Sequence, residues 1–373
     1  MNVVELAQEL IRRPSITPDD GGILDFIRTY FPDFEAKRLD HEGVKNLLLT
    51  KKFGEGLHLA FAGHVDTVPA ADGWSVDPFG AIIKDGFLYG RGAQDMKSGI
   101  AAFLVAVRFI QSFPGQISLI LTSDEEGDGI YGTDIILAHM QQEGMLPDLC
   151  IVAEPTCEER FGDAIKVGRR GSVNGKIVIR GLGGHAAYPS KARNPIEMAV
   201  PLLAAFSGRL LDEGDQFFEP SRLVMTTIQA GKGTTNVIPH ELTLLFNVRN
   251  STKTTKDDIE SFVRHQLEKA GISDYTLEIK QSSKPFITHR GRYADLLTQT
   301  LSAAIKEITG ITPKHSTAGG TSDARYVAAY GVDVVEFGVR NDTIHAPNER
   351  IMTAEIEALK QVFSQFLAKL GGR

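Results

Sequence analysis

The chain has 373 residues, of which 42% are hydrophobic and 23% charged, and this ordinary globular composition excludes a disordered, collagenous or coiled-coil protein. Its 40 Lys and Arg residues against 47 Asp and Glu residues give a net charge of −7, which argues against a nucleic-acid partner. Two cysteines, Cys150 and Cys157, exclude a disulfide framework and favour a reducing compartment.

No membrane or export segment is indicated. The longest apolar run, 100–107, stops at Arg108 and falls short of the roughly 20 residues that a membrane-spanning helix needs. The N-terminal stretch MNVVELAQELIRR carries Glu5 and Glu9 within its apolar pattern and has no small-residue cleavage site, so it predicts an amphipathic helix. We therefore expect a cytoplasmic protein without a membrane partner.

Short, nearly all-apolar strands alternate with helices in the first part of the chain. After the N-terminal helix we expect strands 46–52 and 58–63, helix 97–112, strand 117–123, helix 132–143 and strand 149–153. Strands that are apolar throughout are buried on both faces. The alternation therefore predicts an α/β fold with a mostly parallel sheet and helices on both faces.

The pattern changes in the middle of the chain. Strands 173–180 and 241–249 alternate polar and apolar residues, strands 222–229 and 275–281 are further candidates, and helices are expected at 195–211 and 256–269. One-sided strands suit an antiparallel sheet with one face packed on helices. The order strand, helix, strand, strand, helix, strand predicts a ferredoxin-like α+β domain.

The α/β pattern returns near residue 284, with helix 293–308, a helix opening near Ser322, strand 333–338 and helix 354–370. We therefore expect a catalytic domain formed by residues 1–170 and 284–373. It would be interrupted by an inserted domain of residues 171–283.

Imidazole and carboxylate groups cluster where strands of the α/β part end. These residues are His64, Asp66, Asp95, Glu125, Glu126, Glu154 and His345. Ligands of open α/β sheets bind beyond the carboxyl ends of the strands. Acidic groups converging there repel one another unless a cation is bound, and histidine with carboxylates but no thiolate suits Zn²⁺ or another divalent ion.

Each of these signals has an ordinary structural explanation when taken alone. A histidine after a strand is more often a satisfied core or surface group, and a Glu-Glu pair such as Glu125 and Glu126 is usually a solvated turn. The combination of HxD, EE and E endings with GRGAQDMKSG is difficult to explain in that way. It favours a metal site.

Five stretches, GHVDTVP, YGRGAQDMKSG, TSDEEG, AEPT and GGTSDAR, resemble the dinuclear-zinc family of aminoacylases, deacetylases and exopeptidases. RRPSITPDD, GDAIKVGRRGSVNGKIVIRGLGGHAAYP, NVIPHELTLLFNVR and TIHAPNE are similar to its succinyl-diaminopimelate desuccinylase branch. The resemblance covers nearly the whole chain. It implies hydrolysis of N-succinyl-LL-2,6-diaminopimelate to succinate and LL-2,6-diaminopimelate, for lysine and diaminopimelate biosynthesis, by metal-bound hydroxide.

The resemblance assigns roles to the clustered residues. One zinc would be held by His64, Asp95 and Glu154, and a second ion, zinc or else cobalt or manganese, by Asp95, Glu126 and His345. Glu125 would be the general base and Asp66 would orient His64. Glu125 and Glu126 can differ in this way only if the chain bends there, because a regular strand points neighbours to opposite faces. A cis Asp95–Met96 peptide bond is also implied.

His185 lies in the Gly-rich stretch GLGGHAAYP of the inserted domain. A histidine in such a turn is more often structural. The resemblance instead implies that it reaches the partner subunit's active site and stabilises the tetrahedral oxyanion. That role requires a homodimer formed through the inserted domain.

Recognition of a substrate with several carboxylates favours arginine, which binds carboxylate bidentately. The resemblance implies a substrate-binding set of Arg169, Ser172, Tyr188, Asn236, Arg249, Gly320, Thr321 and Asn341. Paired arginines at a domain crossing are as often plain surface charge. Thr235 and Tyr131 depart from the branch pattern and leave the preferred acyl-amino acid open.

Two other functions remain open at this stage. One is a related reaction, such as acetylornithine deacetylation or dipeptide cleavage. The other is a non-catalytic binding protein on the same scaffold, although Glu125 and every implied metal ligand are present. The chain has no GxGxxG, P-loop or HExxH motif to favour a nucleotide-binding or thermolysin-like protein.

Overall fold

The computed structural model describes residues 1–288 and 291–372, which form two compact units. Unit 1 comprises Met1–Gly168, Ile287–Ser316 and Ser322–Arg373. Unit 2 comprises Arg169–Phe286 and Thr317–Thr321. The chain therefore leaves unit 1 at β9 (Gly168–Arg169), builds most of unit 2 and returns at β16 (Phe286–Ile287). Residues 317–321 then belong to unit 2 once more.

Unit 1 is built on an eight-stranded sheet. In order across it, the strands are β1 (Glu35–Arg38), β2 (Asn46–Lys52), β6 (Gly115–Thr122), β3 (Leu57–His64), β7 (Leu149–Val152), β18 (Asp333–Glu336), β8 (Ala164–Lys166) and β17 (Lys314–Ser316). The central strands β6, β3, β7 and β18 are parallel, and β1 and β2 are antiparallel additions at one edge. The prediction of a mostly parallel sheet is confirmed.

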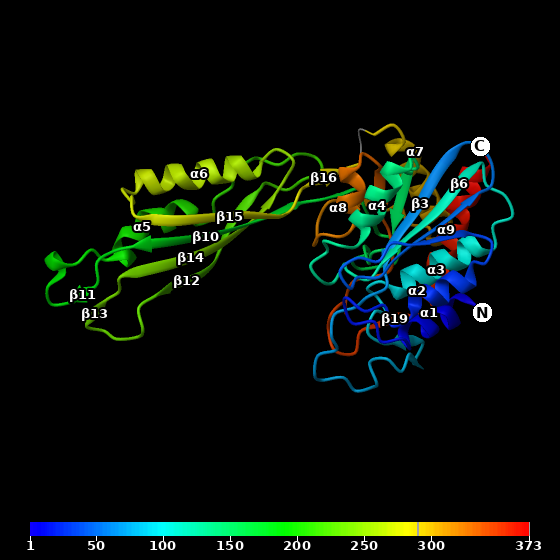
Figure 1. Ribbon diagram of the computed structural model, residues 1–373, viewed down its shortest axis with the longest axis horizontal. Helices are drawn as coiled ribbons and strands as arrows, with labels where there is room; N and C mark the ends of the chain where they lie inside the picture. The colour runs from blue at the N-terminus through cyan, green and yellow to red at the C-terminus, as the bar shows by residue number, and fades with distance from the viewer. Residues whose placement is uncertain (289–290, 373) are drawn as a thin grey trace. The chain divides into compact units, whose positions relative to one another are not determined.

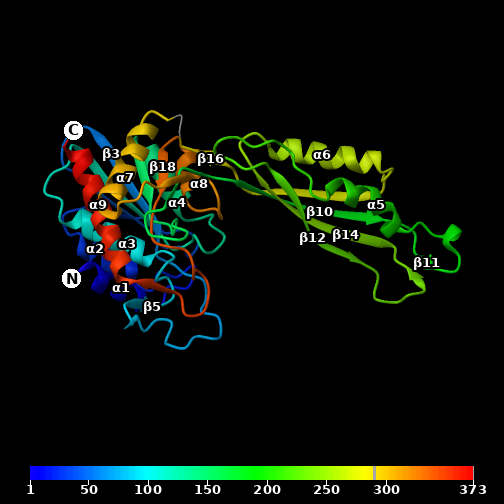
Figure 2. The same ribbon diagram turned by 180° about the vertical axis from the view of Figure 1, so that it is seen from behind.

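Helices cover both faces of this sheet, as predicted. One layer contains α1 (Val3–Ile11), α3 (Lys97–Arg108), α7 (Ala294–Thr309) and α9 (Thr353–Gly371), which lie on the near side in Figure 2. The opposite layer contains α4 (Thr133–Gln142) and α8 (Ala324–Ala329), while α2 (Ile23–Tyr30) contacts β2. The core continues from sheet to helices through the rings of Phe61, Phe103 and Phe363. α3 packs on β3 and against both α1 and α9, and residues 97–107 are all buried, which accounts for its long apolar run.

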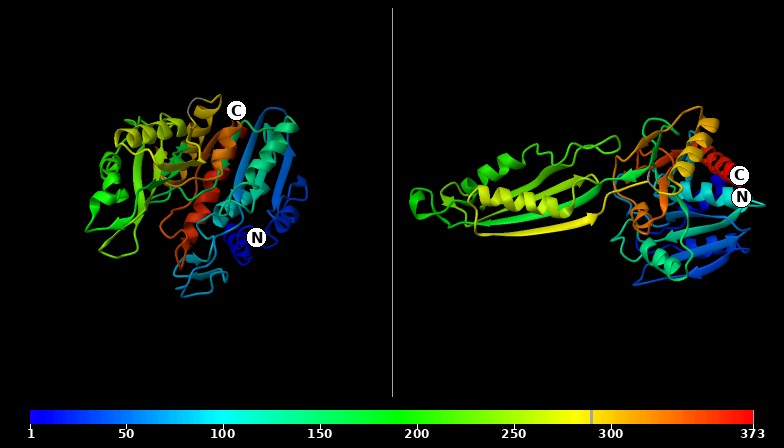
Figure 3. Two further views of the ribbon diagram at one scale, coloured as in Figure 1. Left: turned by 60° about the vertical axis from the view of Figure 1, so that its left-hand side comes forward. Right: turned by 90° about the horizontal axis from the view of Figure 1, so that it is seen from above.

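Unit 2 has the predicted ferredoxin-like order. Its elements are β10 (Gly171–Arg180), α5 (Pro195–Phe206), β12 (Arg222–Ala230), β14 (Glu241–Asn250), α6 (Lys256–Lys269) and β15 (Tyr275–Ser283). The sheet order is β12-β14-β10-β15, antiparallel throughout, and both helices pack on one face (Figures 1 and 3). Alternate residues of β10, including Val173, Ile177 and Ile179, are buried beneath the helices.

Several short elements of the structure are not evident from the sequence. They include a separate three-stranded sheet of β4 (Ile82–Lys84), β5 (Phe87–Tyr89) and β19 (Arg350–Met352), the ribbon β11 (Gly184–His185) and β13 (Val237–Ile238), and η1 (Pro189–Lys191). Such segments are too brief to establish a hydrophobic period. Among the described residues, no helix has both the length and the apolar character needed to cross a membrane.

Candidate metal centre

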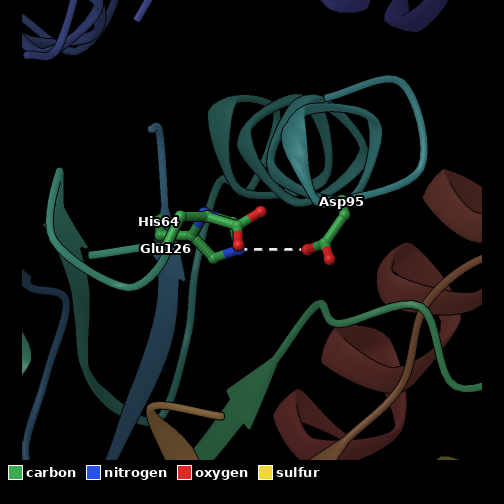
Figure 4. A group of neighbouring side chains, drawn as sticks. All are labelled: His64, Asp95 and Glu126. Atoms are coloured by element: carbon green, nitrogen blue, oxygen red, sulfur yellow. Dashed lines mark hydrogen bonds and ion pairs between the residues drawn. The ribbon is translucent and has the colours of Figure 1, made fainter. Parts of the chain in front are cut away.

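The metal-binding candidates converge at the carboxyl ends of three parallel strands of unit 1. His64 is the last residue of β3, Glu126 lies in the turn after β6, and Glu154 follows β7. Asp95 lies in the loop before α3, and His345 lies in the loop that follows β18. Figure 4 shows His64, Asp95 and Glu126 facing a common space. This is the edge of the sheet at which ligands bind in open α/β folds.

His64 lies at the centre of the first group. Its Nε2 is 3.1 Å from Asp95 Oδ1, 3.7 Å from Glu154 Oε1 and 3.9 Å from Glu125 Oε2. Donor atoms of His64, Glu125 and Glu154 lie within 4.8 Å of one another, as do those of His64, Asp95 and Glu126. Each set could surround a single ion. The geometric sets differ from those implied by the resemblance, because Glu125 lies beside Glu154 and His64 contributes to both.

His345 approaches the cluster from the opposite side of Asp95. Its Nε2 is 2.9 Å from Glu126 Oε1 and 3.4 Å from Asp95 Oδ2. The two oxygens of Asp95 thus face two different histidines, an arrangement in which one carboxylate can be shared by two ions. The Asp95–Met96 peptide bond is cis, as the resemblance implies.

The buried carboxylates of the cluster are not fully compensated by the groups around them. Glu154 Oε1 is buried and has no hydrogen-bond partner among the described residues. Burial raises the pKa of Glu154 well above its ordinary value, and the neighbouring Asp95 and Glu125 charges act in the same direction. Burial likewise raises the pKa of Glu125 to about 8, against the opposing charge of His64. A buried carboxylate without a partner is costly, so these residues fit a bound divalent cation.

Carboxylates of the cluster raise the pKa of both histidines, and Asp95 acts on each of them. Burial alone would lower the pKa of His64, but the carboxylates of Asp66 and Asp95 raise it well above its ordinary value. The contacts of His345 with Asp95 and Glu126 raise its pKa to about 10. Because metal ligands must be deprotonated to bind, a cation would compete with protons for these side chains.

Asp66 links the ends of β3 and β6 through its contacts with His64 and Glu126. His64 Nδ1 is 3.1 Å from the Asp66 backbone oxygen and 3.5 Å from Asp66 Oδ1, which leaves Nε2 directed at Asp95. Asp66 Oδ2 accepts a hydrogen bond from the Glu126 N–H at 3.2 Å. β6 ends at Thr122, and Glu125 and Glu126 occupy the turn beyond it. The predicted bend is therefore present.

Two buried carboxylates near the site were not singled out from the sequence. Asp323, in the stretch GGTSDAR, accepts a hydrogen bond from Thr133 Oγ1 at 2.6 Å, and its charge acts to raise the pKa of Glu125. Glu349, in APNER, accepts hydrogen bonds from the loop that carries Asp95. Both belong to stretches noted from the sequence, but their roles depend on contacts that spacing does not reveal.

Three of the residues expected at the substrate lie together at the β11–β13 ribbon of unit 2. His185 pairs with Val237, the Ala186 N–H donates to the Asn236 oxygen at 3.0 Å, and the rings of His185 and Tyr188 are 6.0 Å apart. His185 and Asn236 line a groove of about 850 Å³, and Tyr188 is exposed. An open groove with a histidine and an amide could receive a polar group.

Other expected substrate residues occupy different places. Arg169 is buried in β9 and donates to the Ala318 oxygen at 3.1 Å; Ser172 lies opposite Arg249 in the β10–β14 pairing. Gly320 and Thr321 belong to the short segment 317–321 of unit 2. Asn341 is in unit 1, where its N–H donates to the Cys157 oxygen at 3.1 Å. Within unit 2 these residues do not join the β11–β13 group.

Comparisons with known proteins agree with this description of the fold. The model of peptidase family M20/M25/M40 matches residues 60–369. The succinyl-diaminopimelate desuccinylase of Sulfurovum sp. (strain NBC37-1) is 56% identical over 365 residues, 98% of each chain. That of Wolinella succinogenes is 56% identical over 366 residues, 98% of this chain and 99% of the relative. An M20 family metallo-carboxypeptidase from Sulfolobus solfataricus has a TM-score of 0.80 at 16% identity over the whole of both chains, which shows a common fold.

Proposed function

The chain belongs to peptidase family M20/M25/M40, and from that premise we propose that it hydrolyses N-succinyl-LL-2,6-diaminopimelate to succinate and LL-2,6-diaminopimelate. The reaction belongs to lysine and diaminopimelate biosynthesis. One observation carries the proposal: a chain 56% identical over its length to a succinyl-diaminopimelate desuccinylase brings three carboxylates and two histidines to one point in unit 1. This cluster supports hydrolysis rather than binding alone.

We propose two divalent ions, both zinc, with cobalt or manganese as alternatives at the second position. His64, Asp95 and Glu154 would hold one ion, and Asp95, Glu126 and His345 the other. Histidine and carboxylate donors without thiolate suit these metals. When bound, the ions polarise the amide carbonyl and acidify water.

Glu125 is the proposed general base. Its carboxylate is mostly buried beside His64, so it can take a proton from the attacking water and return it to the leaving amine. Proton transfer by a positioned side chain contributes typically about 10²–10⁴-fold to rate. Asp66 keeps the His64 ring in its ligand orientation through the contacts at Nδ1.

We propose a homodimer formed through unit 2 and located in the cytoplasm. β12 is an edge strand of the unit 2 sheet, and Val224 and Ile228 on it are about half exposed. Val200 on α5 is 58% exposed. Exposed apolar side chains on an edge strand favour pairing with a second chain. His185 would then stabilise the oxyanion in the partner's active site.

The substrate carries several carboxylates, and the proposed binding groups suit them. Arg169 and Arg249 supply charge, while Ser172, Tyr188, Asn236, Thr321 and Asn341 supply polar groups and Gly320 leaves space. Guanidinium groups bind carboxylates through paired hydrogen bonds.

A substrate panel tests the proposed reaction. The zinc-loaded protein should show a kcat/KM for N-succinyl-LL-2,6-diaminopimelate at least about a hundredfold above those for N-acetylornithine and a dipeptide, because the site would be built to pair the succinyl carboxylate. A higher value for N-acetylornithine or the dipeptide would assign the related reaction instead. Two bound ions with no turnover of any of the three would favour a binding protein.

A further inference from the structure

The carboxylate of Glu349 is almost completely buried and accepts four hydrogen bonds from one loop. Oε1 accepts from the N–H groups of Gln94 at 2.8 Å and Asp95 at 3.2 Å. Oε2 accepts from the Gly92 N–H at 3.1 Å and from Arg91 Nη1 at 2.7 Å. The conformation of the loop that presents Asp95 is therefore defined by this carboxylate.

Local strand pairing explains why Glu349 reaches that loop. β5 and β19 are antiparallel, with Tyr89 opposite Arg350, and the Gly90 N–H continues the ladder to the Glu349 oxygen at 3.0 Å. The chain then turns around the side chain of Glu349. Gly92 has φ +84°, and a Cβ there would lie 2.8 Å from Thr67 Cγ2, so the turn requires glycine.

The same network includes the loop that carries His345. Arg91 is fully buried, pairs with Glu349 and donates from Nη2 to the His345 oxygen at 3.3 Å. His345 has φ +58°, a conformation that a side-chain-bearing residue keeps only when its surroundings enforce it. Gln94 binds the same loop, donating to Asp342 Oδ1 at 2.6 Å and accepting from the Thr343 N–H at 2.9 Å.

We infer that Glu349 and Arg91 are positioning residues, which hold Asp95 and His345 in one fixed relation before a metal ion binds. The inference rests on the proposed metal centre. Neither residue would touch the ion. Their contacts determine where the Asp95 carboxylate and the His345 ring lie, so that binding does not have to order two loops. Loss of such supporting contacts typically lowers metal affinity about 10–100-fold.

Glu349→Gln separates positioning from general stability. The amide has nearly the same shape but one acceptor oxygen, so its NH₂ group would face two of the present donors. Isothermal titration with Zn²⁺, and the visible spectrum of the Co²⁺-loaded protein, should show two ions in the unaltered protein. In the variant at least one binding step should be about 10–100-fold weaker and the Co²⁺ spectrum altered. Arg91→Lys keeps the positive charge but loses the guanidinium, which contacts both Glu349 and the His345 oxygen. This variant should also weaken Zn²⁺ binding and alter the Co²⁺ spectrum.

Asp212→Asn is the matched control. Asp212 is also a carboxylate that fixes loops through several hydrogen bonds, but it lies in unit 2. The Asp212→Asn variant should lower Tm without changing Zn²⁺ affinity or the Co²⁺ spectrum. Unaltered metal affinity and spectrum in Glu349→Gln would overturn the inference, and if that variant does not fold, Arg91→Lys decides in the same way. Failure of the unaltered protein to bind two ions would instead contradict the proposed metal centre.

Discussion

Glu125 and Glu126 are neighbours in sequence but differ in their contacts. The Glu126 N–H donates a hydrogen bond to Asp66, and the Glu126 carboxylate lies 2.9 Å from His345 Nε2. This is the position expected of a metal ligand. We predict that Glu125→Gln keeps two bound ions but lowers kcat about 10²–10⁴-fold, because only the proton carrier is lost. Metal analysis by mass spectrometry and steady-state kinetics on N-succinyl-LL-2,6-diaminopimelate measure the two effects.

Glu126→Gln is the contrasting variant. It removes the same charge one residue later and should lose both turnover and one ion. If Glu125→Gln also lost an ion, or kept near-normal kcat, Glu125 would not be the base.

Residues at strand ends were predictable from the sequence, whereas supporting residues were not. His64 and Glu154 were found because each follows an apolar strand directly, and parallel strands bring such positions together. Glu349 was missed because it acts on backbone N–H groups. Its place depends on the pairing of β5 with β19, two three-residue strands that have no detectable period.

In unit 2, one carboxylate holds the loop after α5 to the turn before α6. Asp212 accepts hydrogen bonds from the N–H groups of Gly214 and Ser221 and from the hydroxyls of Ser221, Ser251 and Thr254. We predict that Asp212→Asn lowers the free energy of unfolding by about 1–3 kcal/mol at pH 7, since hydrogen bonds to a charged group are the stronger ones. Thermal unfolding monitored by circular dichroism measures this change.

The predicted loss depends on pH with a definite sign. Burial would raise the pKa of Asp212, but its hydrogen bonds outweigh burial and hold that pKa well below the ordinary value. A group with a lowered pKa in the folded state stabilises above its unfolded pKa, near about 3.9, and loses that effect as pH falls through the folded value. The Tm difference between the two proteins should therefore be full at pH 7 and shrink below about pH 4. A difference that widened in acid, or an equal loss in Asp257→Asn at the start of α6, would contradict this account.

Elements of different length were predictable to different degrees. Helix 256–269 was predicted with its bounds, because a threonine N-cap and acidic residues precede or open it and Gly271 follows its end. The structure shows that Thr255 and Asp258 form a capping box there. β10 and β14 were evident from their alternation. β1 was not, since it is an exposed edge strand without an apolar face.

The proposed homodimer predicts activity by complementation. A Glu125→Gln subunit retains His185, and a His185→Asn subunit retains Glu125. If His185 acts in the partner's site, a mixed dimer has one complete site, so a 1:1 refolded mixture of the two inactive proteins should regain about a quarter of wild-type turnover. If His185 acts within its own chain, the mixture stays inactive, and analytical ultracentrifugation confirms whether dimers have formed.

The account depends above all on two ions sharing Asp95, which anomalous diffraction at the zinc edge measures directly in crystals of the zinc-loaded protein. We predict two anomalous peaks about 3.5–4 Å apart, with the Asp95 carboxylate between them, one peak beside His64 and Glu154 and the other beside Glu126 and His345. No peak at this site, or zinc bound without Asp95 as a ligand, would contradict the proposed metal centre.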